Sequence, residues 1–376
     1  MYIPAMTRRG FLKAGVALTG TLALGNRGPL AKPASRAERP TLVVWWLNGG
    51  PAGLFNSADA FLANGAFGVT QNNIRSLGNG LYVDAGSLGQ LPTTALRHMA
   101  SVHFRHGLYS HDDSRMAVLQ SGPRSQLLRM AAAMPRSTVP CAVVNNLGLP
   151  VGVTENPPAE QGMGFERVAK LDDTRRTLSI AQFNDIREAY SAFGTNPTID
   201  SQRATFAAVE ALVHEGASVI YAQPAYTGRH DRQFDTHHDD IGKVAREIMT
   251  PITPMLSTFL SRVMAMPDRN VVTLLAGEFS RTLPGADHAK GGTATIIGKY
   301  VKTGAPGRQQ PDGSPPADAP PPEALWAFVA SALRLGESAP FGINPHPDLL
   351  EHGAILGKAS GMMGTTVNVT MGGLDD

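Results

Sequence analysis

The chain has 376 residues, of which 42% are hydrophobic and 17% charged, and these totals suit one large α/β domain or two smaller ones. The formal net charge is only +2 and no basic run alternates with aromatic residues, which argues against a nucleic-acid-binding surface. Cys141 is the single cysteine, which excludes an internal disulfide and a cysteine-based metal site.

Residues 1–37 are typical of an export leader. Arg8 and Arg9 precede Phe11-Leu12-Lys13, an apolar run covers residues 14–24, and Ser35-Arg36-Ala37 offers small residues to a signal peptidase. The paired arginines predict folded export by the twin-arginine machinery, and therefore a periplasmic or extracellular protein. The alternative is an ordinary amphipathic helix or an uncleaved anchor, although the apolar run is shorter than the roughly 20 residues of a membrane span.

Strands and helices are expected to alternate through the rest of the chain. The expected strands, all apolar on both faces, cover residues 41–47, 141–144, 217–222, 270–276 and 293–297. The expected helices cover residues 115–119, 205–214, 240–266 and 322–335. This alternation predicts a single α/β domain over residues 38–376, a doubly wound and mostly parallel sheet with helices on both faces.

Three stretches depart from this alternation. Residues 56–96 are rich in Gly, Asn and Ser and predict an irregular excursion after the first strand. Residues 304–322 are dense in Pro, Gly, Gln and Asp and predict an exposed loop. Pro251 and Pro254 fall inside the expected helix 240–266, which should therefore be kinked or split in two.

Polar residues that directly follow the apolar runs are the candidates for chemistry, because ligands of an open α/β sheet bind beyond the carboxyl ends of its strands. Asp235 and His237 are two positions apart, which puts both side chains on one face of an extended segment. A carboxylate beside an imidazole suits Zn²⁺ or Mn²⁺. The alternative is a solvated loop in which Asp239 or Asp240 caps the next helix.

Two further acidic or histidine clusters follow apolar runs. Glu278 comes just after the run 270–276, and Asp287-His288 follows soon afterwards. Glu278 alone can equally be a partner of Arg281. Three such clusters, each after an apolar strand, together predict a metal site more strongly than any one of them.

A nucleophile is harder to assign. Ser110 lies directly before a helical stretch, where backbone amides and the helix dipole favour an oxyanion or a phosphate. The alternative is that Ser110 only caps the helix.

The motifs and their order resemble one known group, the exported proteins called domain of unknown function 1501, in the alkaline phosphatase and sulfatase superfamily. The matching segments are Leu47-Asn48-Gly49-Gly50, Tyr109-Ser110-His111, Phe234-Asp235-Thr236-His237, Glu278-Phe279-Ser280-Arg281-Thr282 and Asp287-His288. The resemblance spans roughly residues 41–301, and the twin-arginine leader also fits the group.

The resemblance implies an alkaline-phosphatase-like fold with a divalent-metal site, holding Zn²⁺, Mn²⁺ or Ca²⁺, at the strand ends. It implies as metal ligands Asp235, His237, Glu278, Asp287 and His288, with Asn48 as a neutral oxygen donor. It implies Ser110 as the nucleophile, supported by His111 and Arg281.

One position departs from the group. An acidic residue is usual shortly after the Gly-Gly pair, and Ala52 stands there. A site that lacks this carboxylate binds its metal less tightly or holds one ion in place of two. The first hypothesis is therefore an exported hydrolase of phosphate or sulfate esters, acting on small molecules, glycans or lipids. The second is a catalytically silent binding or assembly protein of the same fold. Neither hypothesis specifies an oligomeric state.

Overall fold

The computed structural model describes residues 38–51, 73–144, 165–168, 171–174, 177–194, 197–224, 234–239, 242–282, 286–336 and 341–351. All of them belong to one unit, Glu38–Asp376. The predicted export leader lies outside the described residues. Within the described part, no helix combines the length and the apolar character that crossing a membrane requires.

The main sheet has seven strands. These are β1 (Arg39–Trp46), β4 (Met99–Arg105), β7 (Cys141–Val144), β8 (Glu166–Val168), β9 (Val219–Ala222), β10 (Arg269–Ala276) and β11 (Gly291–Ile297). Their spatial order is β4-β11-β10-β1-β9-β7-β8. Strand β1 is parallel to both of its neighbours, β10 and β9, whereas β11 is antiparallel to β10 and to β4. The sheet is therefore mostly parallel, with β11 reversed.

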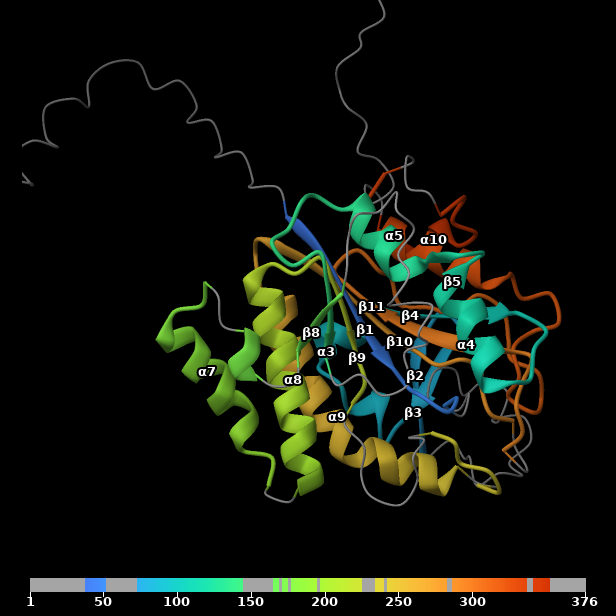
Figure 1. Ribbon diagram of the computed structural model, residues 1–376. Helices are drawn as coiled ribbons and strands as arrows, with labels where there is room; N and C mark the ends of the chain where they lie inside the picture. The colour runs from blue at the N-terminus through green and yellow to red at the C-terminus, as the bar shows by residue number, and fades with distance from the viewer. Residues whose placement is uncertain are drawn as a thin grey trace, which may run out of the picture. The chain divides into compact units, whose positions relative to one another are not determined.

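Helices cover both faces of this sheet (Figure 1). The described α-helices are α3 (Thr93–Leu96), α4 (His111–Leu119), α5 (Gln126–Ala133), α7 (Ile180–Ser191), α8 (Pro197–Glu215), α9 (Lys243–Met264) and α10 (Pro322–Ala332). Alternate residues of β1 point to opposite faces, as the pleat of a strand requires. Val43 and Trp45 pack with the apolar side chains of α7, α8 and α9, while Val44 and Trp46 pack with those of α4, α5 and α10. The expected doubly wound α/β architecture is confirmed.

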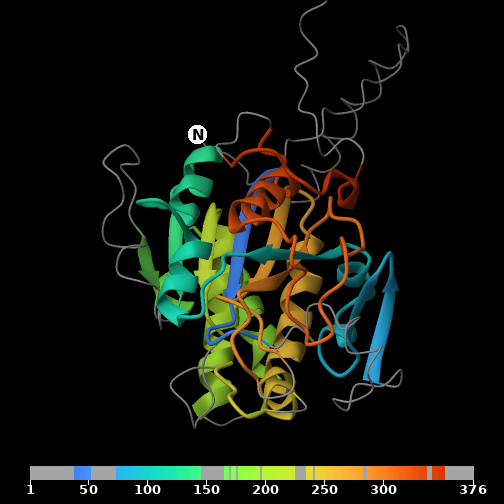
Figure 2. The ribbon, with the colours of Figure 1, turned by 90° about the vertical axis from the view of Figure 1, so that its right-hand side faces the viewer.

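Smaller elements surround the main sheet. They are the hairpin of β2 (Ile74–Gly78) and β3 (Leu81–Asp84), the hairpin of β5 (Gln120–Ser121) and β6 (Arg124–Ser125), and the 3₁₀ turns η3 (Leu88–Gln90), η5 (Leu171–Thr174) and η6 (Pro347–Leu349). Figure 2 shows the β2–β3 hairpin, in light blue, beside the main sheet. The excursion expected over residues 56–96 thus contains regular structure in its described part.

Other local expectations met different outcomes. All five expected strands form, but β11 is antiparallel to β10, and the described residues between the two strands include no crossover helix. Helix α9 is continuous although Pro251 and Pro254 lie inside it, so the expected split does not occur. Cys141 is fully buried in β7, and burial raises the pKa of its thiol. The loop over residues 304–322 forms no helix or strand before α10.

Candidate metal and active site

The candidate site lies at the edge of the sheet where β1 and β10 end. Strands β1 and β10 are parallel, so Asn48 and Glu278 leave the sheet at the same edge. Because β11 runs in the opposite direction, the residues before it also meet this edge. The chain turns back between Arg281 and His288, which form an antiparallel bridge. The reversed strand therefore brings His288 to the end of β10.

Two glycines allow the turn after β1 to pack against its neighbours. Gly49 has φ of +100°, and a Cβ atom there would lie 2.3 Å from the backbone nitrogen of Asp235. Gly50 has φ of +81°, and its Cβ would lie 2.6 Å from the Phe279 ring. The backbone of Phe234 donates to the Asn48 carbonyl at 2.7 Å. Because only glycine tolerates both the left-handed conformation and the close approach, Gly49 lets the segment of Asp235 pack against the end of β1, and Gly50 lets Phe279 pack there.

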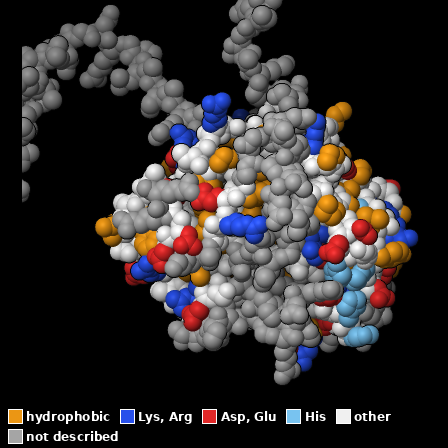
Figure 3. All heavy atoms as spheres, in the orientation of Figure 1, with side chains coloured by type: hydrophobic (Ala, Val, Ile, Leu, Met, Phe, Trp, Pro, Cys, Tyr) orange, Lys and Arg blue, Asp and Glu red, His pale blue; other side chains and the backbone are white. Residues whose placement is uncertain are grey.

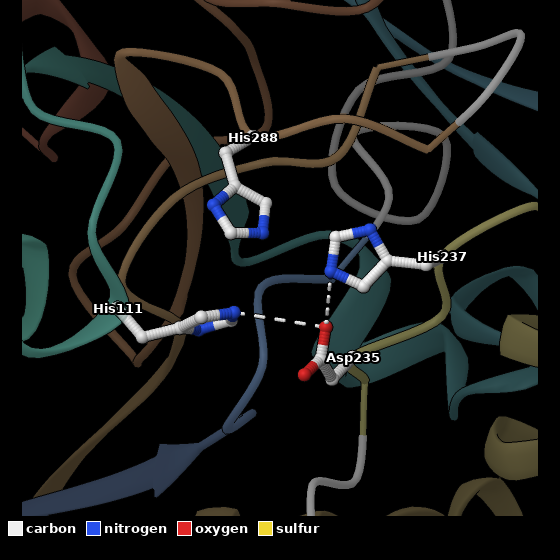
Figure 4. A group of neighbouring side chains, drawn as sticks. All are labelled: His111, Asp235, His237 and His288. Atoms are coloured by element: carbon white, nitrogen blue, oxygen red, sulfur yellow. Dashed lines mark ion pairs between the residues drawn. The ribbon is translucent and has the colours of Figure 1, made fainter.

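Four side chains converge on one point at this edge (Figure 4). His111, Asp235, His237 and His288 each offer one ligand atom, and these atoms all lie within 4.8 Å of one another. Asp235 Oδ1 is 3.0 Å from His237 Nε2 and 3.6 Å from His111 Nε2. The four residues come from the start of α4, from the segment before α9 and from the β10–β11 connection. Figure 3 shows histidine side chains gathered at the surface of this part of the molecule.

Two of the imidazoles are oriented by a second partner. His111 Nδ1 lies 2.7 Å from Glu278 Oε1, and His288 Nδ1 lies 2.6 Å from the carbonyl oxygen of Tyr109. A carboxylate and a backbone carbonyl oxygen accept hydrogen bonds, so each Nδ1 carries the proton and donates it. The lone pair of each ring is then on Nε2, which faces the cluster. A carboxylate or carbonyl behind a histidine is the usual arrangement around a metal ion.

The donor set fits a divalent metal ion. Three imidazole nitrogens and one carboxylate oxygen are ligands that Zn²⁺ and Mn²⁺ accept. His288 Nε2 is buried and has no hydrogen-bond partner among the described residues, which a metal ion would supply. Burial lowers the pKa of His237 and of His288, and the positive charge of Arg281 lowers both further. Both rings are therefore neutral at pH 7, the form that binds a metal.

The buried carboxylate of Glu278 orients the cluster and lies outside the group of four. Its side chain is fully buried, and Oε1 accepts from Gly49 N at 2.9 Å and from His111. Arg115 NH2 is 3.8 Å from the same oxygen. The carbonyl of Glu278 accepts from His106 Nε2 at 2.8 Å. Glu278 thus connects the turn after β1 to the start of α4.

Arg281 is the fully buried cation of the site. Its guanidinium donates to the carbonyl oxygens of Gly49 and Ala286 and forms an ion pair with Asp235. It also lies 3.3 Å from His237 Nδ1 and 3.4 Å from His111 Nε2. Burial lowers the pKa of Arg281, while Asp235 and Glu278 oppose this shift. Since a guanidinium remains protonated in proteins, Arg281 stays positive beside the cluster.

The remaining candidates from the sequence occupy different positions. Asp287 is exposed and lies outside the group of four. Asn48 is buried, and its side-chain oxygen has no hydrogen-bond partner among the described residues. Ser110 is exposed and caps α4, where its Oγ accepts from Asp113 N at 3.3 Å. Asp239 accepts from two amides at the start of α9, so the polar loop both caps that helix and supplies Asp235 and His237.

Two contributions to the site were not anticipated from the sequence. Arg115 lies one helical turn after His111, so both face Glu278, and this i, i+4 spacing was the available signal. The Tyr109 carbonyl carries no sequence signal, because any residue supplies a backbone oxygen. His111, expected only as a supporting group, offers a ligand atom to the same cluster as Asp235.

No family model and no curated protein sequence matches this chain. Among solved structures, a 2-O GAG sulfatase is similar at 10% identity over 83% of this chain and 74% of its own, with a TM-score of 0.39. The integral membrane protein lipooligosaccharide phosphoethanolamine transferase A from Neisseria meningitidis is similar at 8% identity over 87% of this chain and 61% of its own, with a TM-score of 0.38. A protein in the alkaline phosphatase superfamily from Vibrio parahaemolyticus is similar at 8% identity over 81% of this chain and 72% of its own, with a TM-score of 0.34. At these TM-scores, function has to be argued from the residues of this chain.

Proposed function

We propose that this chain is an exported, metal-dependent hydrolase of phosphate or sulfate esters. The observation that carries the proposal is the convergence of His111, Asp235, His237 and His288 at the rim of a buried sheet. The motifs at these positions also support membership of the domain-of-unknown-function 1501 group within the alkaline phosphatase and sulfatase superfamily. Arg8 and Arg9 support export through the twin-arginine pathway to the periplasm or beyond.

The charges around the cluster favour an anionic ester. Asp235 pairs with Arg281, and Glu278 lies next to Arg115, so these two carboxylates and two guanidinium groups cancel. A divalent ion therefore leaves the site with about two positive charges, which attract a phosphate or sulfate ester. The substrate class is a small-molecule, glycan or lipid ester, because His237 is exposed and leaves the cluster open to solvent.

The residues divide the work as follows. A divalent ion held by His111, Asp235, His237 and His288 would polarise the ester oxygens and stabilise the charge that develops on them. His111 and His288 keep their Nε2 atoms turned toward the cluster because Glu278 and the Tyr109 carbonyl hold their Nδ1 atoms. Ser110 adjoins His111 in the chain, and its hydroxyl oxygen accepts one hydrogen bond, from Asp113 N. Ser110 is thus the proposed nucleophile, with water as the other candidate.

The test is metal analysis of the purified protein, followed by hydrolysis of an aryl phosphate and an aryl sulfate with Zn²⁺, Mn²⁺ or Ca²⁺. His111→Ala and His288→Ala should each reduce bound metal and lower hydrolysis at least tenfold. His98→Ala is the matched control, since His98 binds the Val301 carbonyl and is not part of the cluster. A correctly folded protein that hydrolyses neither ester with any of the three ions would exclude the hydrolase.

The second candidate is a catalytically silent binding protein with the same metal site. Two features favour it: Ser110 is engaged as the cap of α4, and Ala52 stands where an acidic residue is usual in the group. Ser110→Ala separates the candidates. A nucleophilic Ser110 predicts a loss of at least a thousandfold in hydrolysis with unchanged metal content. Bound metal without any turnover in the wild type supports the silent protein.

A further inference from the structure

The guanidinium of Arg281 is completely enclosed by acceptors of the protein itself. Nε and NH2 donate to the Gly49 carbonyl at 3.0 and 2.9 Å, and NH1 donates to the Ala286 carbonyl at 2.8 Å. The remaining N–H groups face Asp235 Oδ1, His237 Nδ1 and His111 Nε2. Arg281 is fully buried, so no N–H group is left to bind a substrate oxygen. Its role must therefore be exerted on the cluster.

The position of this charge matters because it touches three of the four candidate ligands. Asp235, His111 and His237 each lie within hydrogen-bonding distance of the guanidinium. Enzymes with two metal ions hold them about 3.5–4 Å apart, where two like charges repel strongly and negative ligands have to offset the repulsion. Here the carboxylate nearest the cluster is already paired with a cation, and the other buried carboxylate, Glu278, faces His111, Gly49 and Arg115.

We infer that Arg281 is a built-in cation that takes the place of a second divalent ion, so the site holds a single ion. The inference rests on the proposed metal site and adds its stoichiometry and the role of one residue. Arg281 acts through the cluster and not on the substrate: its charge lies against Asp235, His111 and His237, and it repels a second ion. Asp235 and Glu278 already face guanidinium groups, so among the described residues of the site a second divalent ion would find no unbalanced carboxylate.

The experiment is calorimetric titration of metal-stripped protein with Zn²⁺ and with Mn²⁺, together with native mass spectrometry of the loaded form. The wild type should bind one ion per chain. Arg281→Met removes the charge at similar length and should tighten binding of the first ion at least tenfold, because a repelling charge next to the ligands is gone. Arg281→Lys keeps the charge but can make fewer of these hydrogen bonds, so it should not show this tightening.

Circular dichroism and thermal unfolding of metal-free protein check that each variant is folded. Arg281→Gln is the second neutral variant. If neither neutral variant folds, the number of ions bound per wild-type chain still tests the inference. Two ions per wild-type chain overturn the inference. A folded Arg281→Met that binds its ion no more tightly than the wild type also overturns it.

The outcomes separate this inference from the proposed function. One ion per chain without hydrolysis of either ester keeps the inference and rejects the hydrolase. Two ions per chain with hydrolysis keep the hydrolase and reject the inference. A protein that binds no ion rejects both.

Discussion

At the scale of single residues, the groups that accept hydrogen bonds from the histidine Nδ1 atoms set the geometry of the site. Glu278 is fully buried, and its Oε1 accepts hydrogen bonds from His111 Nδ1 and Gly49 N. It is not one of the four converging residues. Its second oxygen, Oε2, has no hydrogen-bond partner among the described residues. In the proposed metal site, this carboxylate would fix the tautomer of His111 and make its Nε2 a better ligand.

Replacing this carboxylate should weaken metal binding while leaving the ligands in place. Glu278→Gln removes the negative charge but keeps an oxygen that can accept from His111. We expect roughly 10- to 100-fold weaker binding of Zn²⁺, the usual cost of losing such a partner. Calorimetric titration measures the change, and Glu323→Gln on the exposed start of α10 is the matched control. Equal affinity in the wild type and Glu278→Gln would show that Glu278 does not act through His111.

His103 gives a prediction that is independent of the site. It is 3% exposed in β4, its Nδ1 lies 2.9 Å from Thr293 Oγ1, and its Nε2 is buried without a partner among the described residues. Burial, with a smaller effect of His346, lowers the pKa of His103 from 6.5 to about 4. Between these pH values the unfolded chain binds a proton that the folded chain does not, so the free energy of unfolding falls as the pH falls.

The proton that only the unfolded chain binds should lower the free energy of unfolding by about 2 kcal/mol at pH 5. This effect should vanish above pH 7, because both pKa values lie below that pH. His103→Asn removes the titrating group and keeps a polar side chain toward Thr293. Denaturant unfolding of both proteins from pH 7.5 to pH 4.5 measures the difference, in which titrations common to both cancel. Parallel pH profiles for wild type and variant would contradict the assignment.

At the scale of elements, the turn after β1 and the reversed strand β11 assemble the site. Gly49 lets the backbone of β1 approach the Asp235 segment, and β11 returns His288 to the edge where β10 ends. The turn and the strand join segments that are far apart in the sequence. A change in either should therefore disturb the candidate metal ligands together with the fold.

The matched pair Gly49→Ala and Gly78→Ala isolates the close approach. Both glycines have positive φ, but a Cβ at Gly49 meets the Asp235 backbone at 2.3 Å, whereas a Cβ at Gly78 meets nothing within 4 Å. Gly78→Ala should lower the free energy of unfolding by about 1 kcal/mol, the cost of a left-handed alanine. Gly49→Ala should cost at least about 3 kcal/mol and also weaken metal binding, since backbone must move. Similar losses in both variants, measured by urea unfolding, would rule out the contact with Asp235.

At the scale of the whole molecule, the proposed leader predicts where the folded protein is found in the cell. Arg8→Lys combined with Arg9→Lys should leave the protein folded in the cytoplasm with residues 1–37 attached, because the twin-arginine receptor reads both arginines. Cell fractionation and N-terminal sequencing measure this. The exported wild type should begin near Glu38. Unchanged export of the double variant would point to a different route.

The sequence predicted the sheet better than it predicted the site. Apolar runs of β-rich residues identified β1, β7, β9, β10 and β11, because strands buried on both faces leave a continuous apolar signal. Strand β4 was missed, since Ser101, His103 and Arg105 alternate with its apolar residues. That omission matters because β4 leads the chain to His111.

The amino-acid sequence by itself determined the α/β alternation and the residue types that follow each buried strand. Tertiary structure alone decided that β11 runs antiparallel, that His111 meets Asp235 and His288, and that Glu278 lies behind a histidine. It alone showed Arg281 enclosed among the candidate ligands. The physical reason is sequence distance: periodicity reports the burial of neighbours along the chain, whereas these contacts join residues that only packing of the sheet brings together.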